Sequence, residues 1–156
     1  MLEVGCNTGA NLYLLAKTNP EAALYGIDIN GHAVTRGQQW FRRSGMHQVR
    51  LSVSAVDSLS DFATQSVDVV LSDAVLTHVG PDKLPRALAE MRRVARRGLV
   101  LNEYAAREPP PDNYDGGRFV YNYWALFPGC VVEGERSDFQ ASGWDSYGWL
   151  FVVRFQ

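Results

Sequence analysis

The residues with the clearest chemical potential form a short glycine-containing stretch at the start of the chain, Glu3-Val4-Gly5-Cys6-Asn7-Thr8-Gly9. Glycine at positions 5 and 9 lets the backbone turn tightly and approach a ligand closely. Asp28 follows nineteen residues after Gly9, at the end of the next apolar run, and this spacing suits a carboxylate that accepts both hydroxyls of a ribose. The pattern favours a nucleoside-binding turn over a plain strand–turn–helix with a solvated aspartate.

The side chains of this turn also indicate which kind of nucleoside it suits. The dinucleotide fingerprint is G-x-G-x-x-G, and its second glycine makes room for a pyrophosphate. Here Asn7 carries a side chain where the phosphate needs space, and the Glu3 carboxylate would repel a pyrophosphate. The same carboxylate would attract an ammonium or a sulfonium group. The turn therefore favours a cationic nucleoside over NAD.

Candidates for the reacting half of the site follow two later apolar runs. Asp73 and His78 come after the fourth run, and Glu103 and Tyr104 come after the fifth. Because the carboxyl ends of parallel strands meet at one edge of a sheet, all four could face the reacting group of a ligand. His78 is the best general base by residue type, and a structural histidine is the alternative. Glu103 and Tyr104 are either substrate contacts or ordinary polar groups at a strand end.

The remaining histidines, cysteines and arginine pairs are interpreted as non-catalytic. His32 and His47 have no partners at metal-ligand spacing, so we expect surface positions and no metal site. Two cysteines, Cys6 and Cys130, make no disulfide framework. Paired arginines between residues 92 and 97 are typical of a solvated helix face.

Hydrophobic periodicity predicts alternating strands and helices through the first two thirds of the chain. Asn30 is a predicted N-cap, and Pro81 is a predicted first-turn residue of the third helix. Arg96-Arg97-Gly98 would end that helix, with cations followed by glycine. The predicted strands cover residues 2–5, 24–28, 49–54, 67–71 and 98–101, and the predicted helices begin near residues 10, 30 and 81.

Beyond residue 104 the pattern changes. Three prolines at 109–111 and two glycines at 116–117 mark a long loop, and residues 121–127 form a short aromatic helical segment at most. The pattern predicts two strands, over residues 131–136 and 149–155, with no helix between them. Two such strands indicate an antiparallel hairpin at the sheet edge. The aromatic residues of this region either form a wall of the substrate site or pack in the core: Tyr114, Tyr121, Tyr123 and Trp124.

Strands that alternate with helices predict an α/β fold, a doubly wound and mainly parallel Rossmann-like sheet with the C-terminal antiparallel hairpin added. A length of 156 residues predicts a single domain, residues 1–156. Hydrophobic residues make up 46% and charged residues 21% of the chain, which is ordinary for a globular domain and excludes a disordered or fibrous protein.

Charge and apolar runs bear on the partners. The formal net charge is −2 without a block of like charge, which predicts no nucleic-acid partner. The longest apolar run near the C-terminus, residues 149–153, is too short to span a bilayer, so no membrane partner is expected. The cysteine usage and the lack of a signal-peptide pattern predict a reducing, cytoplasmic location.

At the level of motifs, the chain resembles the class I S-adenosylmethionine-dependent methyltransferases, in the manner of a methyltransferase type 11 domain. Glu3, Gly5 and Gly9 match the family's first motif, E/D-x-G-x-G-x-G, with Asn7 in place of the middle glycine. The run 26–29 resembles the second motif, residues 67–79 resemble the fourth-strand motif, and residues 84–97 resemble the helix that follows it. The resemblance implies the strand order 3-2-1-4-5-7-6 and S-adenosylmethionine as methyl donor.

The resemblance also implies which residues hold the cofactor, including Asp73 on the methionyl amine. They are Glu3, Gly5, Cys6, Asn7, Gly9, Asp28, Ile29, Ser54, Ala55, Val56 and Asp73. Two features depart from the family. Ser54 stands where the family has an aspartate for the adenine amino group, with Asp57 nearby as a substitute. Helices that precede the first strand in the family are missing, so we expect that the chain starts inside a larger domain and binds cofactor weakly.

The resulting hypothesis is a methyltransferase that acts on a small-molecule acceptor, with His78, Asp73 and Glu103 as catalytic candidates. The acceptor would enter over residues 73–78, 103–104 and 105–124. Whether the acceptor atom is oxygen, nitrogen or carbon is open, although an Asn-Pro-Pro-Tyr motif after the fourth strand is missing, which argues against methylation of DNA bases or glutamine. The alternatives are a non-catalytic nucleoside-binding domain and, less favoured, an NAD-dependent oxidoreductase.

Overall fold

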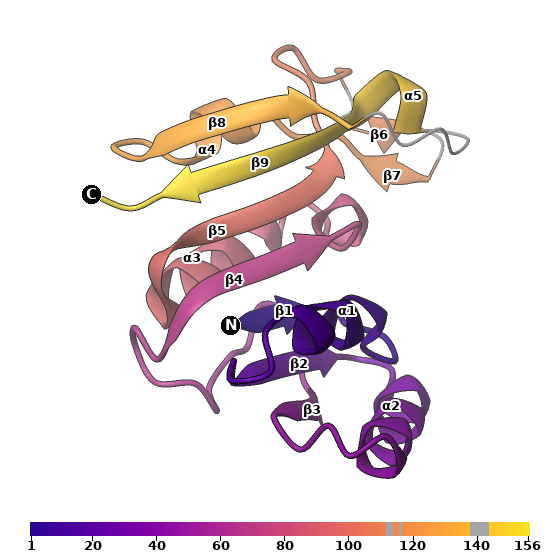
Figure 1. Cartoon of the computed structure of the whole chain (residues 1–156). Helices are drawn as coiled ribbons and strands as arrows, with labels where there is room; N and C mark the ends of the chain where they lie inside the picture. The colour runs from indigo at the N-terminus through magenta and orange to yellow at the C-terminus, as the bar shows by residue number, and fades with distance from the viewer. Residues whose placement is uncertain (112–113, 116, 138–143) are drawn as a thin grey trace.

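Seven strands form one sheet, in the order β3-β2-β1-β4-β5-β9-β8 (Figure 1). The computed structural model describes residues 1–111, 114–115, 117–137 and 144–156. The first five strands pair in parallel, and β9 and β8 pair antiparallel at one end of the sheet. Counted within this sheet alone, the order is 3-2-1-4-5-7-6, which confirms the expected doubly wound α/β fold with its C-terminal hairpin. The strands are β1 (Leu2–Val4), β2 (Leu24–Asp28), β3 (Val49–Val53), β4 (Val67–Asp73), β5 (Ala95–Tyr104), β8 (Val131–Arg136) and β9 (Gly148–Arg154).

Three helices connect the parallel strands. α2 begins at the predicted cap, because the Asn30 side chain accepts hydrogen bonds from the backbone N–H groups of His32 and Ala33 at 3.1 and 3.2 Å. The helices are α1 (Ala10–Thr18), α2 (Gly31–Arg43) and α3 (Leu84–Val94). The shorter elements are the 3₁₀ helix η1 (Leu76–His78), the two-stranded pair β6 (Tyr114–Asp115) and β7 (Arg118–Phe119), α4 (Tyr123–Leu126) and α5 (Trp144–Tyr147).

The predicted boundary between the third helix and the fifth strand is wrong. α3 ends at Val94 and β5 begins at Ala95, so the stretch Arg96-Arg97-Gly98 lies in the strand instead of ending the helix. Backbone pairing decides the boundary, because Ala95 already pairs with Val67 of β4 and the glycine pairs with β9. Tertiary pairing therefore overrides the local helix-end signal of the two arginines.

Two smaller expectations also need correction. α3 begins at Leu84, so Pro85 and not Pro81 lies in its first turn. Residues 80–83 form a separate turn, in which the Gly80 carbonyl accepts from the N–H groups of Lys83 and Leu84 at 3.0 Å. The hairpin contains α5 between its two strands, where no helix was expected; a four-residue helix is too short to leave a visible period.

Buried side chains form two clusters, one beneath α1 and α2 and one beneath α3 and α4. Leu12 and Phe41 anchor the helices of the first cluster. Met91, Leu99 and Phe151 belong to the second, which joins α3 to β5 and β9. None of the described helices combines the length and apolar character needed to cross a membrane.

Candidate functional site

The turn after β1 contains three residues with a left-handed backbone. Gly5 and Gly9 have φ angles of 67° and 87°, and Asn7 has a φ of 50°. This left-handed region is open to glycine without strain. Space excludes a side chain as well, because a Cβ atom on Gly5 would lie 2.2 Å from a methyl carbon of Val75. The glycine turn is therefore packed directly against the segment that follows β4.

Asp28 ends β2 beside this turn, and two backbone N–H groups fix its carboxylate. Asn7 N–H donates to Oδ2 at 2.7 Å, and Asn30 N–H donates to Oδ1 at 2.8 Å. An ionised carboxylate offers about four acceptor positions, so each oxygen keeps acceptor capacity. Asp28 is thus held in one orientation with room to accept two further hydrogen bonds.

A hollow of about 300 Å³ opens beside Asp28. The Ile29 side chain is 77% exposed there and offers an apolar surface. The hollow is lined by Gly5, Asp28, Ile29, Ser54, Val56, Ala74, Val75, His78 and Val79. Ala55 and Asp57 are not among the described residues that line it. The Ser54 hydroxyl donates to the carbonyl of Ser58 at 2.8 Å.

An amide links two carboxylates on the other side of the glycine turn. Asn11 Nδ2, from α1, donates to Glu3 Oε1 at 2.8 Å and to Asp73 Oδ2 at 2.9 Å. Asn102 Nδ2, from β5, donates to Asp73 Oδ1 at 2.7 Å. The ends of β1, β4 and β5 are thereby joined into one polar network.

Glu3 is the incomplete member of this network. It is 2% exposed, and its Oε2 atom has no hydrogen-bond partner among the described residues. Burial raises the pKa of Glu3 to about 7; the Asn11 hydrogen bond lowers it, and the nearby charges of Asp73 and Asp28 add to the rise. A buried carboxylate oxygen without a donor is costly, and a cationic ligand group placed beside it would remove that cost.

Asp73 opens onto a second hollow, of about 450 Å³, between α1 and the β8–β9 hairpin. Its lining residues are Asn11, Leu14, Leu15, Leu71, Asp73, Asn102, Glu135, Arg136, Ser137 and Leu150. The next residue, Ala74, lines the first hollow. The two hollows therefore lie on either side of the junction between the glycine turn and the end of β4.

Cys6 lies in the glycine turn, but its side chain is buried beneath it. The thiol is in contact with the backbone of β2, where a Cβ atom on Gly26 would lie 2.7 Å from Sγ. Burial, together with the charges of Glu3 and Asp28, raises the pKa of Cys6 to about 12. A neutral, buried thiol fills space here, so a contribution of Cys6 to a ligand is limited to its backbone.

Glu103 is buried and lines neither of these two hollows, which fits the strand-end polar group and not the catalytic or substrate-contacting residue. It is fully buried, and its carboxylate accepts hydrogen bonds from Ser72 Oγ at 2.6 Å and from the backbone N–H groups of Val75, Leu76 and Thr77 at 2.9, 3.0 and 3.0 Å. Burial raises the pKa of Glu103, while these four hydrogen bonds lower it. The group organises the chain around it and has no access to a reacting atom.

His78 and Tyr104 differ in their exposure to solvent. His78 is exposed and lines the hollow beside Asp28, as a general base would require. Tyr104 is fully buried, with its ring 4.9 Å from that of Trp144 in a T-shaped contact and the Arg118 guanidinium 5.2 Å from the ring centre. The expected substrate contact of Tyr104 does not fit this burial.

The aromatic residues of the C-terminal region pack in the core instead of forming an open wall. Tyr121 and Tyr123 are 5% and 0% exposed. The Trp124 ring lies 4.8 Å from Trp149 and 4.9 Å from Phe151. The side chain of Tyr114 lies outside the described part of the structure.

In the described residues, no group of three or more His, Cys, Asp or Glu side chains is placed to hold a metal ion. The candidate site consists of the glycine turn, the carboxylates of Asp28 and Glu3 on its two sides, and the two hollows of about 300 and 450 Å³.

Residues 1–98 match the family model described as a methyltransferase domain. The chain belongs to this family. Among curated proteins, the methyltransferase domain is 29% identical over 107 residues to O-methyltransferase 3 of Dictyostelium discoideum and 29% identical over 108 residues to tRNA N(3)-cytidine methyltransferase METTL6 of Homo sapiens. These matches cover 65% and 67% of the chain but only 24% and 38% of the two relatives, so the chain spans well under half of their length.

Solved structures share the fold over nearly the whole methyltransferase domain. A SAM-dependent methyltransferase from Methanosarcina mazei superimposes with a TM-score of 0.76 at 21% identity, covering 99% of this chain and 91% of that one. The [4+2]-cyclase SpnF superimposes with the same TM-score at 20% identity, covering 99% of this chain and 73% of that one. The expected fold is confirmed, while the second structure carries the name of a different reaction on the same fold.

The methyltransferase domain uses two amides that sequence reasoning missed. Asn11 and Asn102 orient Asp73, although they stand 62 and 29 residues away from it along the chain. No local pattern marks either residue. Only the observation that Asn102 pairs with Asp73 on the strand next to β4 would have pointed to it.

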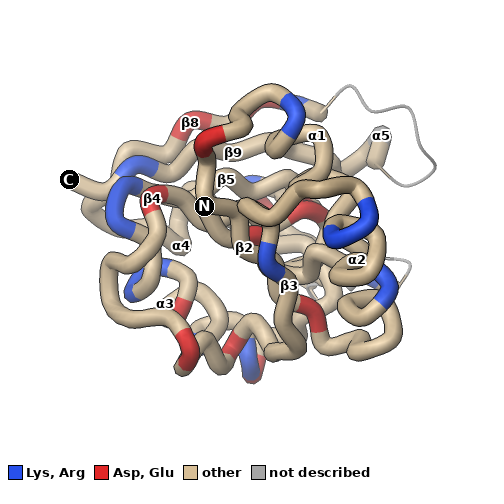
Figure 2. Tube along the Cα trace, turned by 60° about the horizontal axis from the view of Figure 1, so that its bottom comes forward, with Lys and Arg blue, Asp and Glu red and all other residues tan. Residues whose placement is uncertain are grey.

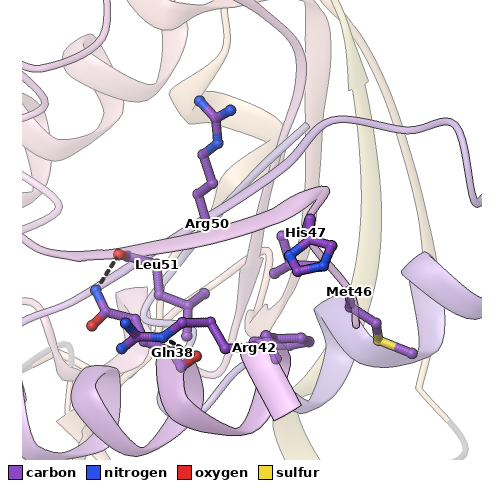
Figure 3. A pocket seen from close by; sticks show the side chains of 8 residues that line it. Gln38, Arg42, Met46, His47, Arg50 and Leu51 are labelled. Carbon is purple, nitrogen blue, oxygen red and sulfur yellow. Dashed lines mark hydrogen bonds between the residues drawn. The ribbon is translucent and has the colours of Figure 1, made fainter. Parts of the chain in front are cut away.

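A third hollow, of about 330 Å³, lies between α2 and β3 (Figure 3). Gln38 Nε2 donates to the Leu51 carbonyl at 2.8 Å and so links α2 to β3. Figure 3 shows that the Arg50 side chain points away from Gln38 and Arg42. This hollow is lined by Gln38, Phe41, Arg42, Met46, His47, Val49, Arg50 and Leu51, none of which lines the other two hollows. It is a separate feature of the surface.

Proposed function

We propose that this domain transfers a methyl group from S-adenosylmethionine to a small-molecule acceptor. The observation that carries the proposal is the pair of carboxylates on opposite sides of the glycine turn. On one side, the Asp28 carboxylate has spare acceptor capacity beside the 300 Å³ hollow. On the other side, Glu3, which Asn11 links to Asp73, has a buried oxygen without a hydrogen-bond partner among the described residues. A nucleoside with a cationic tail matches this pair, and a pyrophosphate does not.

The residues around the turn fit the parts of this cofactor. Asp28 would accept the ribose hydroxyls, and the exposed Ile29 and Val56 would pack against the base in the 300 Å³ hollow. Asp73, oriented by its two amides, would accept the methionyl ammonium with Glu3 behind it. When bound, S-adenosylmethionine supplies a methyl group on a cationic sulfur that an acceptor nucleophile can displace. The chain's own task is alignment, which is the main source of rate in such displacements.

We propose His78 as the group that takes the proton from the acceptor. It is exposed on the rim of the hollow that would hold the nucleoside, and imidazole is the side chain that most often serves as a general base. Asp73 is assigned to the cofactor rather than to proton transfer, because both of its oxygens already accept amide hydrogen bonds.

An RNA acceptor is the second candidate, because two curated relatives carry the names of tRNA methyltransferases. One surface supports it: Figure 2 shows Lys and Arg without acidic residues along α2, and no Asp or Glu occurs between Asp28 and Asp57. Exposed arginines of this stretch are Arg36, Arg42, Arg43 and Arg50. However, a helix of 13 residues is roughly 20 Å long, so the arginines at the end of α2 lie far from Asp28 at its start. This distance favours the small-molecule acceptor.

The test has two steps. Calorimetry with S-adenosylhomocysteine and with NAD separates a methyltransferase site from a dinucleotide site, and we expect binding of the first compound only. Transfer of labelled methyl from S-adenosylmethionine is then measured with a metabolite extract and with bulk tRNA as acceptors. Binding without transfer to either pool would favour a non-catalytic domain, and transfer to tRNA that is lost in Arg42→Glu would favour RNA.

We also propose a cytoplasmic location. Cys6 and Cys130 are both free thiols, as expected in a reducing compartment.

A further inference from the structure

We propose that Glu103 is a positioning residue for the cofactor pocket, which it shapes by holding the backbone of residues 75–77. The inference rests on the proposed function for the identity of the ligand. The positioning itself is a property of the unliganded chain and can be measured without a ligand.

Three consecutive backbone N–H groups converge on this one carboxylate. Val75 and Leu76 donate to Oε1, and Thr77 donates to Oε2. Leu76 and Thr77 are fully buried, so without Glu103 their N–H groups would have no access to water. A carboxylate is the side chain that can accept all three bonds at once while Ser72 Oγ donates a fourth.

The segment that Glu103 holds has a conformation that needs outside support. Ala74 has a φ of 56°, a left-handed backbone that residues with a Cβ rarely adopt and that persists when the surroundings impose it. Ala74 N–H donates to the carbonyl of Asn102 at 2.9 Å, so the turn is tied to β5 at the residue next to Glu103. On the far side, the Thr77 hydroxyl donates to the carbonyl of Phe119 at 3.1 Å. Glu103 lies between these two attachments and accepts three consecutive backbone N–H groups of the segment.

The same segment is a wall of the proposed cofactor pocket. Ala74, Val75, His78 and Val79 all line the hollow beside Asp28. The Val75 side chain is packed so closely on Gly5 that a Cβ atom there would lie 2.2 Å away. A shift of residues 75–77 would therefore move both the surface that faces the glycine turn and the exposed His78. Glu103 acts on the site through this wall, without touching the ligand.

The test compares Glu103→Gln with Glu90→Gln. The glutamine at 103 keeps one acceptor oxygen but turns its NH₂ group toward backbone N–H donors. Glu90 is a matched control, because its Oε2 accepts the Leu59 N–H at 2.9 Å and it pairs with Arg93, yet it lines none of the three hollows. Hydrogen exchange of the unliganded variants reports the backbone, and calorimetry with S-adenosylhomocysteine reports the pocket.

We expect the amides of residues 75–77 to exchange about tenfold to a hundredfold faster in Glu103→Gln, the usual effect of losing a charge-assisted hydrogen bond. S-adenosylhomocysteine should bind about tenfold more weakly to this variant. Glu90→Gln should speed exchange near Leu59 only and bind the compound like the wild type. This difference separates positioning of the pocket from a general loss of stability, which both variants would share.

Unchanged exchange at residues 75–77 in Glu103→Gln would overturn the proposal, as would faster exchange with unchanged affinity. If that variant does not fold, the wild type decides: the three amides should be as protected as those of the sheet, and exchange at the rate of open loops would overturn the proposal. A wild type that binds no S-adenosylhomocysteine at all would refute the proposed function, and the exchange data alone would then decide the role of Glu103.

Discussion

Two glutamates of the same sheet are buried almost equally but differ in their hydrogen bonds. Glu3 in β1 is 2% exposed and Glu103 in β5 is 0% exposed. Glu103 accepts four hydrogen bonds, whereas Glu3 accepts one and keeps an oxygen without a partner in the described structure. Burial raises the pKa of both groups. Burial therefore does not distinguish a binding group from a structural one, but the count of unsatisfied atoms does.

This comparison separates the residues of the site into two kinds. Groups that the fold satisfies completely hold the backbone in place, as Glu103 does for the segment after β4. Groups that keep acceptor capacity, such as Glu3 and Asp28, are the ones that we propose to contact the cofactor.

The largest effect is expected at the exposed end of the segment that Glu103 holds. His78→Ala should lower turnover about a hundredfold to ten-thousandfold, the usual contribution of a general base. Affinity for S-adenosylhomocysteine should stay within about twofold, since the proposed ribose and amine contacts lie elsewhere. The measurement is kcat and KM with the acceptor found in the transfer assay. An alanine variant with full turnover would return His78 to a structural role.

The next effect concerns stability and bears directly on the two glutamates. Glu103→Gln should lower the free energy of unfolding by about 2–4 kcal/mol, because it leaves buried N–H donors unsatisfied. Glu3→Gln should leave it unchanged or raise it slightly, because the amide keeps the bond to Asn11 and removes a buried charge that lacks a partner. Urea denaturation followed by tryptophan fluorescence gives both values. Equal destabilisation by the two substitutions would show that the comparison is mistaken.

Asp28 provides a third test. Asp28→Asn should weaken S-adenosylhomocysteine binding about tenfold to a hundredfold, since it loses one charged acceptor and turns an NH₂ group toward the N–H of Asn7 or Asn30. Asp57→Asn is the control, because Asp57 follows the next strand without lining the hollow. Calorimetry measures both. Similar losses in the two variants would show that Asp57 takes the role that the family gives to an aspartate after the third strand.

The sequence was sufficient for the parallel part of the fold. Strands β1 to β4 are short apolar runs that end in glycine or polar residues, and Asn30 caps α2 by a local hydrogen bond, so both can be recognised without tertiary information. The start of β5 could not be recognised, because pairing with β4 and β9 converts two arginines with a helix-end signal into strand residues.

The candidate site, too, could be predicted from local sequence only in part. Spacing alone was enough to select Gly5, Gly9 and Asp28, since they lie within one strand–turn–helix–strand unit. Spacing could not show that Glu103 turns inward toward Ser72 and not toward a ligand. Strand ends bring such residues to one edge, but side-chain direction and hydrogen bonding are decided by residues from other elements.

The smallest effect is a pH dependence of ligand binding that originates at Glu3. Burial, with Asp73 and Asp28 nearby, raises the pKa of Glu3 from 4.5 to about 7 in the folded chain. A raised carboxyl pKa means that the folded state binds the proton more tightly than the unfolded state, so this group's contribution to stability falls as pH rises from about 4.5 to 7 and is constant above. A cationic ligand favours the ionised form, so binding releases a proton and affinity should rise by at most about 25-fold between pH 5.5 and 7.5 and then level off. Calorimetry of S-adenosylhomocysteine across that range, repeated in buffers of different ionisation enthalpy, measures both the affinity and the released proton.

Glu3→Gln should flatten the profile at the weaker, low-pH affinity. A profile with the same slope in that variant would assign the titration to another group and leave Glu3 as a merely buried carboxylate, no different in kind from Glu103.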